Sequence, residues 1–362
     1  MKGTFKAHML PLDKDQIDQK VFFEELIDAN TKLEVYKAKI EDSKLDSSWY
    51  LPNLQQKEAL ASSLLEGTQA TLDGVLVNQI DPNDKDKNLN EVSNYYHATF
   101  KGYDLLSKRD FSNEFFYDIH SILMEGNVRK PELIGEYRKK QNYIGRSDPQ
   151  HSIVYTPPKA EEVPVLMDNL IKYMNNSEDN YRPLVRTAII HAQFETIHPF
   201  MDGNGRVGRM LIPMYLYSKK VVKNPYFFIS EALEQDKLRY YTLLNNTREK
   251  GEWSEWIKYF LSAVTKQCNK YIGVIEEINN LYERDLARGL NIMNSAKMVS
   301  IINALYKLPI INSKELSKLT DISMPSLNRY LNKLVENQLL FTDNKKRNRT
   351  FYYYDLLDIL RK

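Results

Sequence analysis

The sequence predicts a mainly helical protein, with one small β-hairpin in its first 300 residues and a smaller domain of helices and strands at its C-terminal end. Three observations support this fold class. The 362 residues include 24 Tyr but only 13 Gly, in a chain rich in Leu, Lys and Asn. Apolar residues recur at helical spacing along most of the length. Ahead of residue 300, one stretch alone has β-prone runs bounded by turn residues.

Composition restricts the classes of protein. The formal net charge of +2 argues neither for nor against nucleic-acid binding. The single Cys268 excludes an internal disulfide framework and suits a reducing cytosol. No stretch approaches the roughly 20 apolar residues of a membrane helix, and the first residues lead into no signal-peptide core. We therefore expect a soluble, cytoplasmic protein of two or three domains with no membrane partner.

The first 89 residues form an N-terminal helical region. One helical pattern runs from Gln16 to Lys39. A second helix is predicted from about residue 55 to 65, followed by Gly67 as a natural residue to end it. Ser62 and Glu66 would lie on one face of that helix, four residues apart.

Residues 90–124 continue the helical pattern, and two histidines lie within it. Because no further ligands lie at metal-binding spacing, we interpret His97 and His120 as packed core residues. The predicted apolar core of this stretch is Tyr95, Tyr96, Phe100, Leu105, Phe115, Phe116, Ile119 and Leu123. Two β-prone runs follow, 135–145 and 152–158, and the turn residues between them predict a hairpin. His151 lies beside its second strand, where we expect it to be exposed.

A helix from residue 164 to 174 and another from 184 to 197 lead into the stretch His198-Pro199-Phe200-Met201-Asp202-Gly203-Asn204-Gly205-Arg206-Val207-Gly208-Arg209. Pro199 stops the helix before it, and the next helical pattern begins near Arg206. The Gly-Asn-Gly turn therefore lies at a helix N-terminus, where free backbone N–H groups and the helix dipole favour anions. Glycine lets the main chain approach a phosphate closely.

The side chains of this stretch suit phosphate chemistry. Arg206 and Arg209 share one helix face and can each grip phosphate oxygens in pairs. Asp202 is a suitable ligand for Mg²⁺, which takes one or two carboxylates together with substrate phosphates. His198 titrates near neutral pH and can act as a general base. His191 lies on nearly the same helical face, but metal-binding histidines are normally four apart, so we assign it a structural role.

These twelve residues resemble the signature of the Fic (filamentation induced by cAMP) family, H-P-F-x-[DE]-G-N-G-R-x-x-R, at every fixed position. The resemblance implies a Fic-type helical bundle that moves AMP from ATP to a Ser, Thr or Tyr hydroxyl of a target protein. His198 would be the base and Asp202 the Mg²⁺ ligand. The region of Asn204 and Gly205 would cradle the α-phosphate, and Arg206 and Arg209 would hold the outer phosphates. Within the signature, the nucleotide-binding positions would be Gly203, Asn204, Gly205, Arg206, Gly208 and Arg209.

Two other segments resemble parts of the same family. Ser62, Glu66 and Gly67 match the inhibitory pattern [ST]-x-x-x-E-[GN], which implies that Glu66 pairs with Arg209 and hinders ATP binding. The alternative is an ordinary helix end capped by Gly67. The hairpin resembles the family's flap, which would bind a target segment by strand addition, although a plain surface hairpin has the same pattern.

Downstream of the signature, Pro213 is expected to bend or break its helix. In the next helix, from 230 to 247, the family resemblance suggests that Tyr240, Tyr241 or Asn245 contacts adenine; core aromatics are the alternative. Residues Trp253, Trp256, Tyr259, Phe260 and Val264 have helical spacing and are assigned to the core.

A connecting helix (267–290) precedes a change in composition at about residue 291. Residues 291–362 predict three helices, 296–307, 313–319 and 324–337, and two strands, 339–342 and 350–354, around the basic residues 345–349. This order resembles a winged helix-turn-helix. Ser323 would cap its recognition helix, with Pro325 near the first position, and the groove-facing residues would be Ser326, Asn328 and Arg329. DNA and protein both remain open as its partner.

The expected domains are thus 1–89, 90–266, 267–290 and 291–362. The main hypothesis is an adenylyltransferase, active on a target protein and on itself, and inhibited by Glu66. Phosphoryl transfer or removal of AMP at the same site are neighbouring alternatives, and a DNA-binding regulator with a nucleotide-sensing core is another class. A homodimer is left open.

Overall fold

The computed structural model describes residues 4–82, 85–126, 134–145, 153–176, 179–223, 226–343, 345 and 349–362. The hairpin turn with His151 and residues 346–348 of the expected wing lie outside them. The chain divides into two compact units. Unit 1 takes residues 1–33, 61–68 and 90–267, and unit 2 takes residues 34–60, 69–89 and 268–362.

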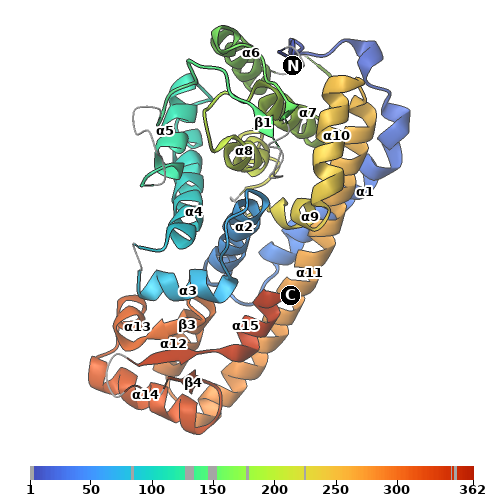
Figure 1. Cartoon of the computed structure of the whole chain (residues 1–362). Coiled ribbons are helices and arrows are strands. Elements are labelled where there is room, and N and C mark those ends of the chain that lie inside the picture. Colours follow the sequence, from blue (N-terminus) through green and yellow to red (C-terminus); the bar gives the residue numbers. More distant parts are fainter. Residues whose placement is uncertain are drawn as a thin grey trace. The chain divides into compact units, whose positions relative to one another are not determined.

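Helices dominate both units, as expected (Figure 1). The helices of unit 1 are α5 (Asn113–Leu123), α6 (Val163–Asn175), α7 (Pro183–Ile197), α8 (Asn204–Ser218), α9 (Ser230–Gln235) and α10 (Lys237–Glu249). Four helices have residues in both units: α1 (Phe23–Glu41), α2 (Leu51–Leu65), α4 (Lys87–Leu106) and α11 (Trp253–Ile292). Short 3-10 turns cover Lys14–Gln16, Gln19–Phe22, Ser47–Trp49 and Ala160–Glu162. Among the described residues, no helix has the length and apolar character to span a membrane.

The centre of unit 1 is α7, which packs against α6 and α8. Every residue of α7 from Leu184 to Ile197 is buried, so this helix has no solvent-facing side. The predicted core residues Trp253, Trp256, Tyr259, Phe260 and Val264 are all buried as well. Two predictions for α4 are wrong: His97 is exposed, and Phe100 is 41% exposed. Both lie on the side of α4 that faces away from its buried residues. Phe100 still makes an edge contact with the ring of Tyr96.

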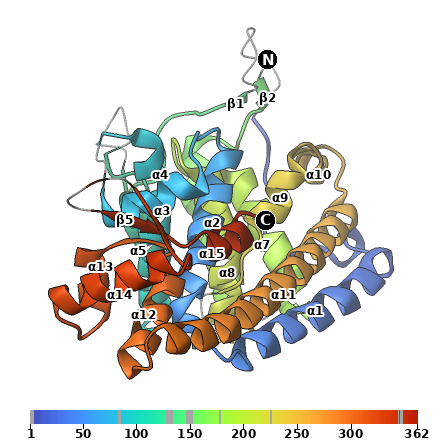
Figure 2. The same cartoon turned by 90° about the horizontal axis from the view of Figure 1, so that it is seen from below.

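The hairpin of unit 1 consists of β1 (Ile144–Gly145) and β2 (Ile153–Tyr155), which pair antiparallel and lie side by side in Figure 2. The expected break at Pro213 does not occur, since α8 continues through it to Ser218.

Unit 2 contains α3 (Leu72–Ile80), α12 (Ala296–Lys307), β3 (Ile310–Asn312), α13 (Ser313–Leu319), α14 (Met324–Glu336), β4 (Phe341–Thr342), β5 (Thr350–Tyr352) and α15 (Tyr354–Arg361). Its antiparallel sheet has the order β3-β5-β4. The helices α12, α13 and α14 were predicted, but α3, β3 and α15 were not. The expected strand 350–354 ends at Tyr352, because Leu356, Leu357 and Leu360 are buried as one face of α15. Ser323 makes no capping bond, although Pro325 does lie in the first turn of α14.

Candidate active site

His198 occupies a special backbone position. It is the residue that ends α7, and its φ of 51° and ψ of 60° are left-handed. Such a conformation is uncommon outside glycine and needs support from its surroundings. The support comes from Arg138, whose Nε donates to the carbonyl of His198 at 2.9 Å and whose Nη2 donates to the carbonyl of Pro158 at 2.6 Å. Arg138 also donates its backbone N–H to the carbonyl of Pro199 at 2.8 Å.

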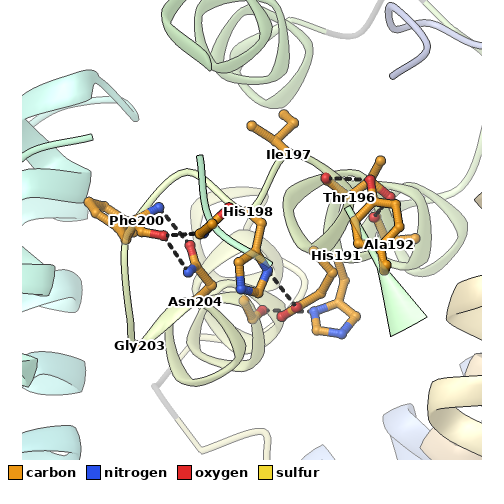
Figure 3. A network of polar contacts seen from close by, with 12 residues as sticks. His191, Ala192, Thr196, Ile197, His198, Phe200, Gly203 and Asn204 are labelled. Atoms are coloured by element: carbon orange, nitrogen blue, oxygen red, sulfur yellow. Dashed lines mark hydrogen bonds and ion pairs between the residues drawn. The ribbon is translucent and has the colours of Figure 1, made fainter. Parts of the chain in front are cut away.

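Asn204 fixes the other side of the loop. Its Oδ1 accepts the backbone N–H of Phe200, and its Nδ2 donates to the carbonyl of Phe200, both at 2.8 Å (Figure 3). Its side chain is 2% exposed and is used entirely within the loop. Asn204 therefore offers only its backbone N–H to a ligand. Gly203, at the N-terminal cap of α8, has a φ of 77°, which requires glycine or a residue that tolerates the left-handed region.

The first two turns of α8 carry the two predicted arginines. The first N–H groups of a helix have no acceptor within it and favour an anion. Arg206 is buried, and its Nε and Nη1 have no hydrogen-bond partner among the described residues. The same is true of Nη1 of Arg209. Buried N–H groups without a partner are costly, so these atoms are suited to take phosphate oxygens.

Arg209 is held by the last turn of α2 and by the residue that follows this helix. Its Nη2 donates to Oε1 of Glu66 at 2.7 Å and to the carbonyl of Ser62 at 2.8 Å, and its Nε donates to Oγ of Ser62 at 2.8 Å. Burial opposes the ionised form of Glu66, but the charge and hydrogen bond of Arg209 outweigh it and lower the pKa of Glu66. The expected pair of Glu66 and Arg209 is therefore present. Gly67 has a φ of 95°, as expected for a left-handed residue that ends a helix.

The end of α2 has further partners that the sequence did not reveal. Lys237 Nζ and Tyr241 Oη, both on α10, donate to the carbonyl of Leu65 at 2.7 and 3.3 Å. Thr68 donates to Oε2 of Glu91 on α4 at 2.5 Å. The segment that carries Glu66 is thus held by α4, α8 and α10.

Two glycines of α8 allow side chains to approach closely. A Cβ atom on Gly205 would lie 2.2 Å from Oε1 of Glu66, and one on Gly208 would lie 2.3 Å from Oε1 of Glu195. Glu66 therefore lies against the first turn of α8, where an anion would bind. The space beside Gly208 is taken by the carboxyl of Glu195. The structure therefore gives Gly208 no direct nucleotide-binding role, contrary to the prediction.

The electrostatics around His198 favour a neutral imidazole. Burial, with help from the positive charge of Arg248, lowers the pKa of His198 to about 3. Arg248 of α10 donates from Nε to Oγ1 of Thr196 at 3.1 Å and stacks on the ring of Tyr155 in β2. A neutral imidazole at physiological pH is the form that can accept a proton.

The histidines behind this site have structural roles, as expected. His191 is fully buried between the carbonyl of Gly208 and the hydroxyl of Tyr240, each 2.9 Å from a ring nitrogen. His120 stacks on Phe200 and lies 3.1 Å from the carbonyl of Asp202. Both rings therefore fix the loop and α8 in place.

The three candidates for adenine contact lie in different environments. Tyr240 is 0% exposed and bonded to His191, which agrees with the core alternative. Tyr241 is 40% exposed. Asn245 is half-buried, and its Oδ1 has no hydrogen-bond partner among the described residues. Of the three, only Tyr241 has an exposed side chain, because Tyr240 and Oδ1 of Asn245 are buried.

Asp202 is the residue with the chemistry to hold Mg²⁺. Its side chain is 71% exposed, and Oδ1 accepts the backbone N–H of Gly203 at 2.6 Å. No group of three or more metal-binding side chains occurs in the part of the chain that the structure describes. One exposed carboxylate fits an ion whose other ligands are phosphate oxygens and water, as is common for Mg²⁺.

Comparison with known proteins agrees with this geometry. The model of the Fic/DOC family matches residues 110–216, and that of the Fic/DOC family N-terminal region matches residues 23–104. The chain belongs to the Fic/DOC family. A solved Fic family protein from Desulfovibrio desulfuricans has a TM-score of 0.59 at 22% identity, with 92% of this chain and 95% of that chain covered. Fic-1 from C. elegans has a TM-score of 0.53 at 18% identity, with 71% and 74% covered. At these identities the likeness concerns the Fic fold alone.

The curated relatives of this Fic protein match it over a smaller share of their own length. The protein adenylyltransferase Fic of Aedes aegypti is 25% identical over 254 residues, which is 67% of this chain and 45% of the relative. The corresponding protein of Drosophila willistoni is 24% identical over 260 residues, or 69% and 46%. The chain thus spans less than half the length of these relatives.

Two functional candidates in the Fic core escaped the sequence analysis. Glu195 lies in the last turn of α7 beside His198, and Arg138 comes from the segment ahead of β1. Arg138 lies in the first β-prone run beside Lys139 and Lys140, and the local pattern does not distinguish it from them. Glu195 is one of several polar residues in α7, and only its position beside the ring of His198 distinguishes it from the others.

Proposed function

We propose that this Fic protein is a protein adenylyltransferase that moves AMP from ATP to a Ser, Thr or Tyr hydroxyl of a target protein. The chain itself is one of its targets in this proposal. The observation that carries the proposal is the set of buried N–H groups of Arg206 and Arg209 on α8 that have no hydrogen-bond partner in the described part of the chain, with His198 at the end of the adjoining helix. The curated relatives named as adenylyltransferases support the same activity.

The residues divide the reaction between them. The N–H groups of the first turn of α8 bind the α-phosphate, and the guanidinium groups of Arg206 and Arg209 bind the outer phosphates. Mg²⁺, held by Asp202, would offset phosphate charge. His198 accepts the proton of the target hydroxyl, whose oxygen attacks the α-phosphorus. The bond from that phosphorus to the bridging oxygen breaks, and pyrophosphate leaves.

Glu66 inhibits this reaction in the proposal. While Arg209 is bonded to Glu66, its charge is already neutralised, and the Glu66 carboxylate lies against Gly205. An incoming phosphate would find Arg209 already paired and would be repelled by the negative charge of the Glu66 carboxylate. ATP binding therefore requires residues 62–68 to move away from Arg209.

The flap and the target complete the proposal. The two strands of the hairpin, β1 and β2, would add a segment of the target as a further strand, which delivers its hydroxyl to His198. Tyr155 of β2 donates its hydroxyl to the carbonyl of Thr196 at 2.9 Å, so this strand is tied to the last turn of α7.

Mass spectrometry of the modified protein tests the activity. The Glu66→Gly variant is incubated with ATP and Mg²⁺, with and without cell extract, and bound adducts are identified. An AMP group on a hydroxyl side chain is the expected result. A phosphoryl group alone would replace the proposal with phosphoryl transfer, and no adduct on any protein would leave AMP removal or nucleotide sensing as the better account.

For residues 291–362 we propose a winged helix-turn-helix domain. Its support is the order α12, α13, α14, β4 and β5, with Asn328 and Arg329 exposed on α14. A gel-shift titration of the full chain with duplex DNA at increasing salt tests DNA as its partner. Binding that Arg329→Ala weakens is expected; equal binding by both proteins would favour a protein partner.

A further inference from the structure

We propose that Glu195 is a positioning residue whose carboxylate acts as the charge partner of His198 and stabilises the imidazolium that forms during AMP transfer. The inference rests on the proposed function for its kinetic part only. Glu195 lies outside the twelve-residue signature, and the sequence alone assigned no role to it.

The geometry brings the two side chains together. Glu195 is in the last turn of α7, three residues before His198, and its Oε2 lies 3.9 Å from Nδ1 of His198. The side chain of Glu195 is 9% exposed, and its Oε1 has no hydrogen-bond partner among the described residues. A buried carboxyl oxygen without a partner is costly, which argues against a purely structural role. In catalytic pairs such a contact is often long before the substrate binds and then shortens.

The carboxyl has a place built for it on α8. A Cβ atom on Gly208 would lie 2.3 Å from Oε1 of Glu195 and 3.2 Å from the ring of Phe194. Any larger residue at position 208 would force Glu195 to move. The missing side chain of Gly208 thus keeps the carboxyl of Glu195 beside the base.

Charges on every neighbouring element act on this carboxyl. Burial raises the pKa of Glu195 to about 7, with Arg209 of α8 and Arg248 of α10 acting in the opposite direction and Glu66 raising it further. Tyr240 and Tyr241 of α10 also face it and stay neutral, because burial raises the pKa of each. The carboxyl therefore passes between its neutral and ionised forms near neutral pH.

The chemical consequence concerns one proton. When Nε2 of His198 takes the proton of the target hydroxyl, the ring becomes positive and each of its two nitrogens carries a proton. The main-chain carbonyl of Glu195 already favours the charged ring, and the carboxylate adds a full negative charge in a site with little water. Below the pKa of Glu195 this charge is absent, so the base is weaker.

NMR titration of the histidine rings tests the pairing without any substrate. The full chain has six histidines, so selectively labelled protein gives few signals, and His198→Ala assigns the one of interest. We expect the His198 ring signals to inflect near pH 7 in the wild type and not in Glu195→Gln. Gln has the size of Glu and resembles its neutral form, so folding should be retained. Identical curves in the two proteins would overturn the proposal.

Kinetics test the effect on the reaction. In the Glu66→Gly background, Glu195→Gln should lower kcat about tenfold and leave KM for ATP unchanged. It should also remove the fall in kcat on the acidic side of the pH profile. In this background we expect that fall below pH 7, because the charge of Glu66 no longer raises the pKa of Glu195. The matched control is Glu255→Gln, at an exposed carboxylate of α11, which should change neither.

The outcomes separate the two proposals. A lower rate with an unchanged pH profile would reduce Glu195 to a structural residue and overturn the inference, as would an unchanged kcat. If the Glu66→Gly parent transfers no AMP, the proposed function fails, and the NMR titration alone decides whether Glu195 is the partner of His198.

Discussion

Replacement of Glu66 by Gly should increase ATP binding, and the structure sets the size of the effect. The substitution removes one charged hydrogen bond to Arg209, at 2.7 Å, and leaves the two bonds from Ser62. A hydrogen bond between charged groups is worth about 1.5–3 kcal/mol. Because the Glu66 side chain is 36% exposed, solvent screening favours the lower value, about 1.5 kcal/mol.

That energy corresponds to about a tenfold gain in affinity, since about 1.4 kcal/mol is a factor of ten. The gain is a lower limit, because the variant also clears the space beside Gly205, where Oε1 of Glu66 now lies. Glu66→Gln serves as the matched variant. It removes the charge but keeps a side chain of the same size against α8, so its gain should be smaller.

Isothermal titration of the full chain with ATP and Mg²⁺ measures both effects. Affinity should rise from wild type to Glu66→Gln to Glu66→Gly, and the rate of transfer from α-labelled ATP should follow the same order. Equal affinities in all three proteins would refute the view that Glu66 competes with ATP for Arg209.

Three other changes have outcomes that the structure specifies. Arg138→Ala removes a cation bonded to the carbonyl of His198 and should lower the free energy of unfolding by about 3 kcal/mol in a urea titration, with little recovery in Arg138→Lys; an unchanged midpoint would contradict this. Gly208→Ala should displace Glu195 and cost about 1–3 kcal/mol, seen as a lower Tm, whereas an unchanged Tm would mean that the neighbours yield freely. Burial lowers the pKa of His191 from 6.5 to about 3. Between these two pH values the unfolded chain binds one proton more at this residue than the folded chain. The free energy of unfolding should therefore fall by about 1.4 kcal/mol for each pH unit between pH 6.5 and about pH 3. Relative to wild type, His191→Asn should have a shallower slope over that range, and equal slopes would exclude His191 as its source.

Local patterns predicted the backbone geometry around His198. The helix end at His198, the Gly-Asn-Gly turn and the two arginines of α8 follow from residue types at fixed spacing. The contact between Glu66 and Arg209 joins residues 143 apart, and it was predictable only through the family resemblance. Hydrophobic periodicity likewise predicted α7 and most of α11.

The remaining features depend on tertiary packing. Asn204 seemed a phosphate ligand, but its side chain is bonded to Phe200 because the loop needs both of its groups. Lys237 contacts the end of α2 from a helix far along the chain, which no local pattern reveals. The strand β3 has three residues, too few for periodicity, and the aromatic run ahead of α15 concealed its amphipathic pattern.

The most direct test of the account is transfer of label from ATP by the full-length Glu66→Gly variant and by the Glu66→Gly/His198→Ala double variant. Each is given Mg²⁺ and ATP labelled at either the α- or the γ-phosphate. We expect protein-bound label from the α position in the single variant, none in the double variant, and none from the γ position in either. Label from the γ position alone, or α label that persists without His198, would contradict it.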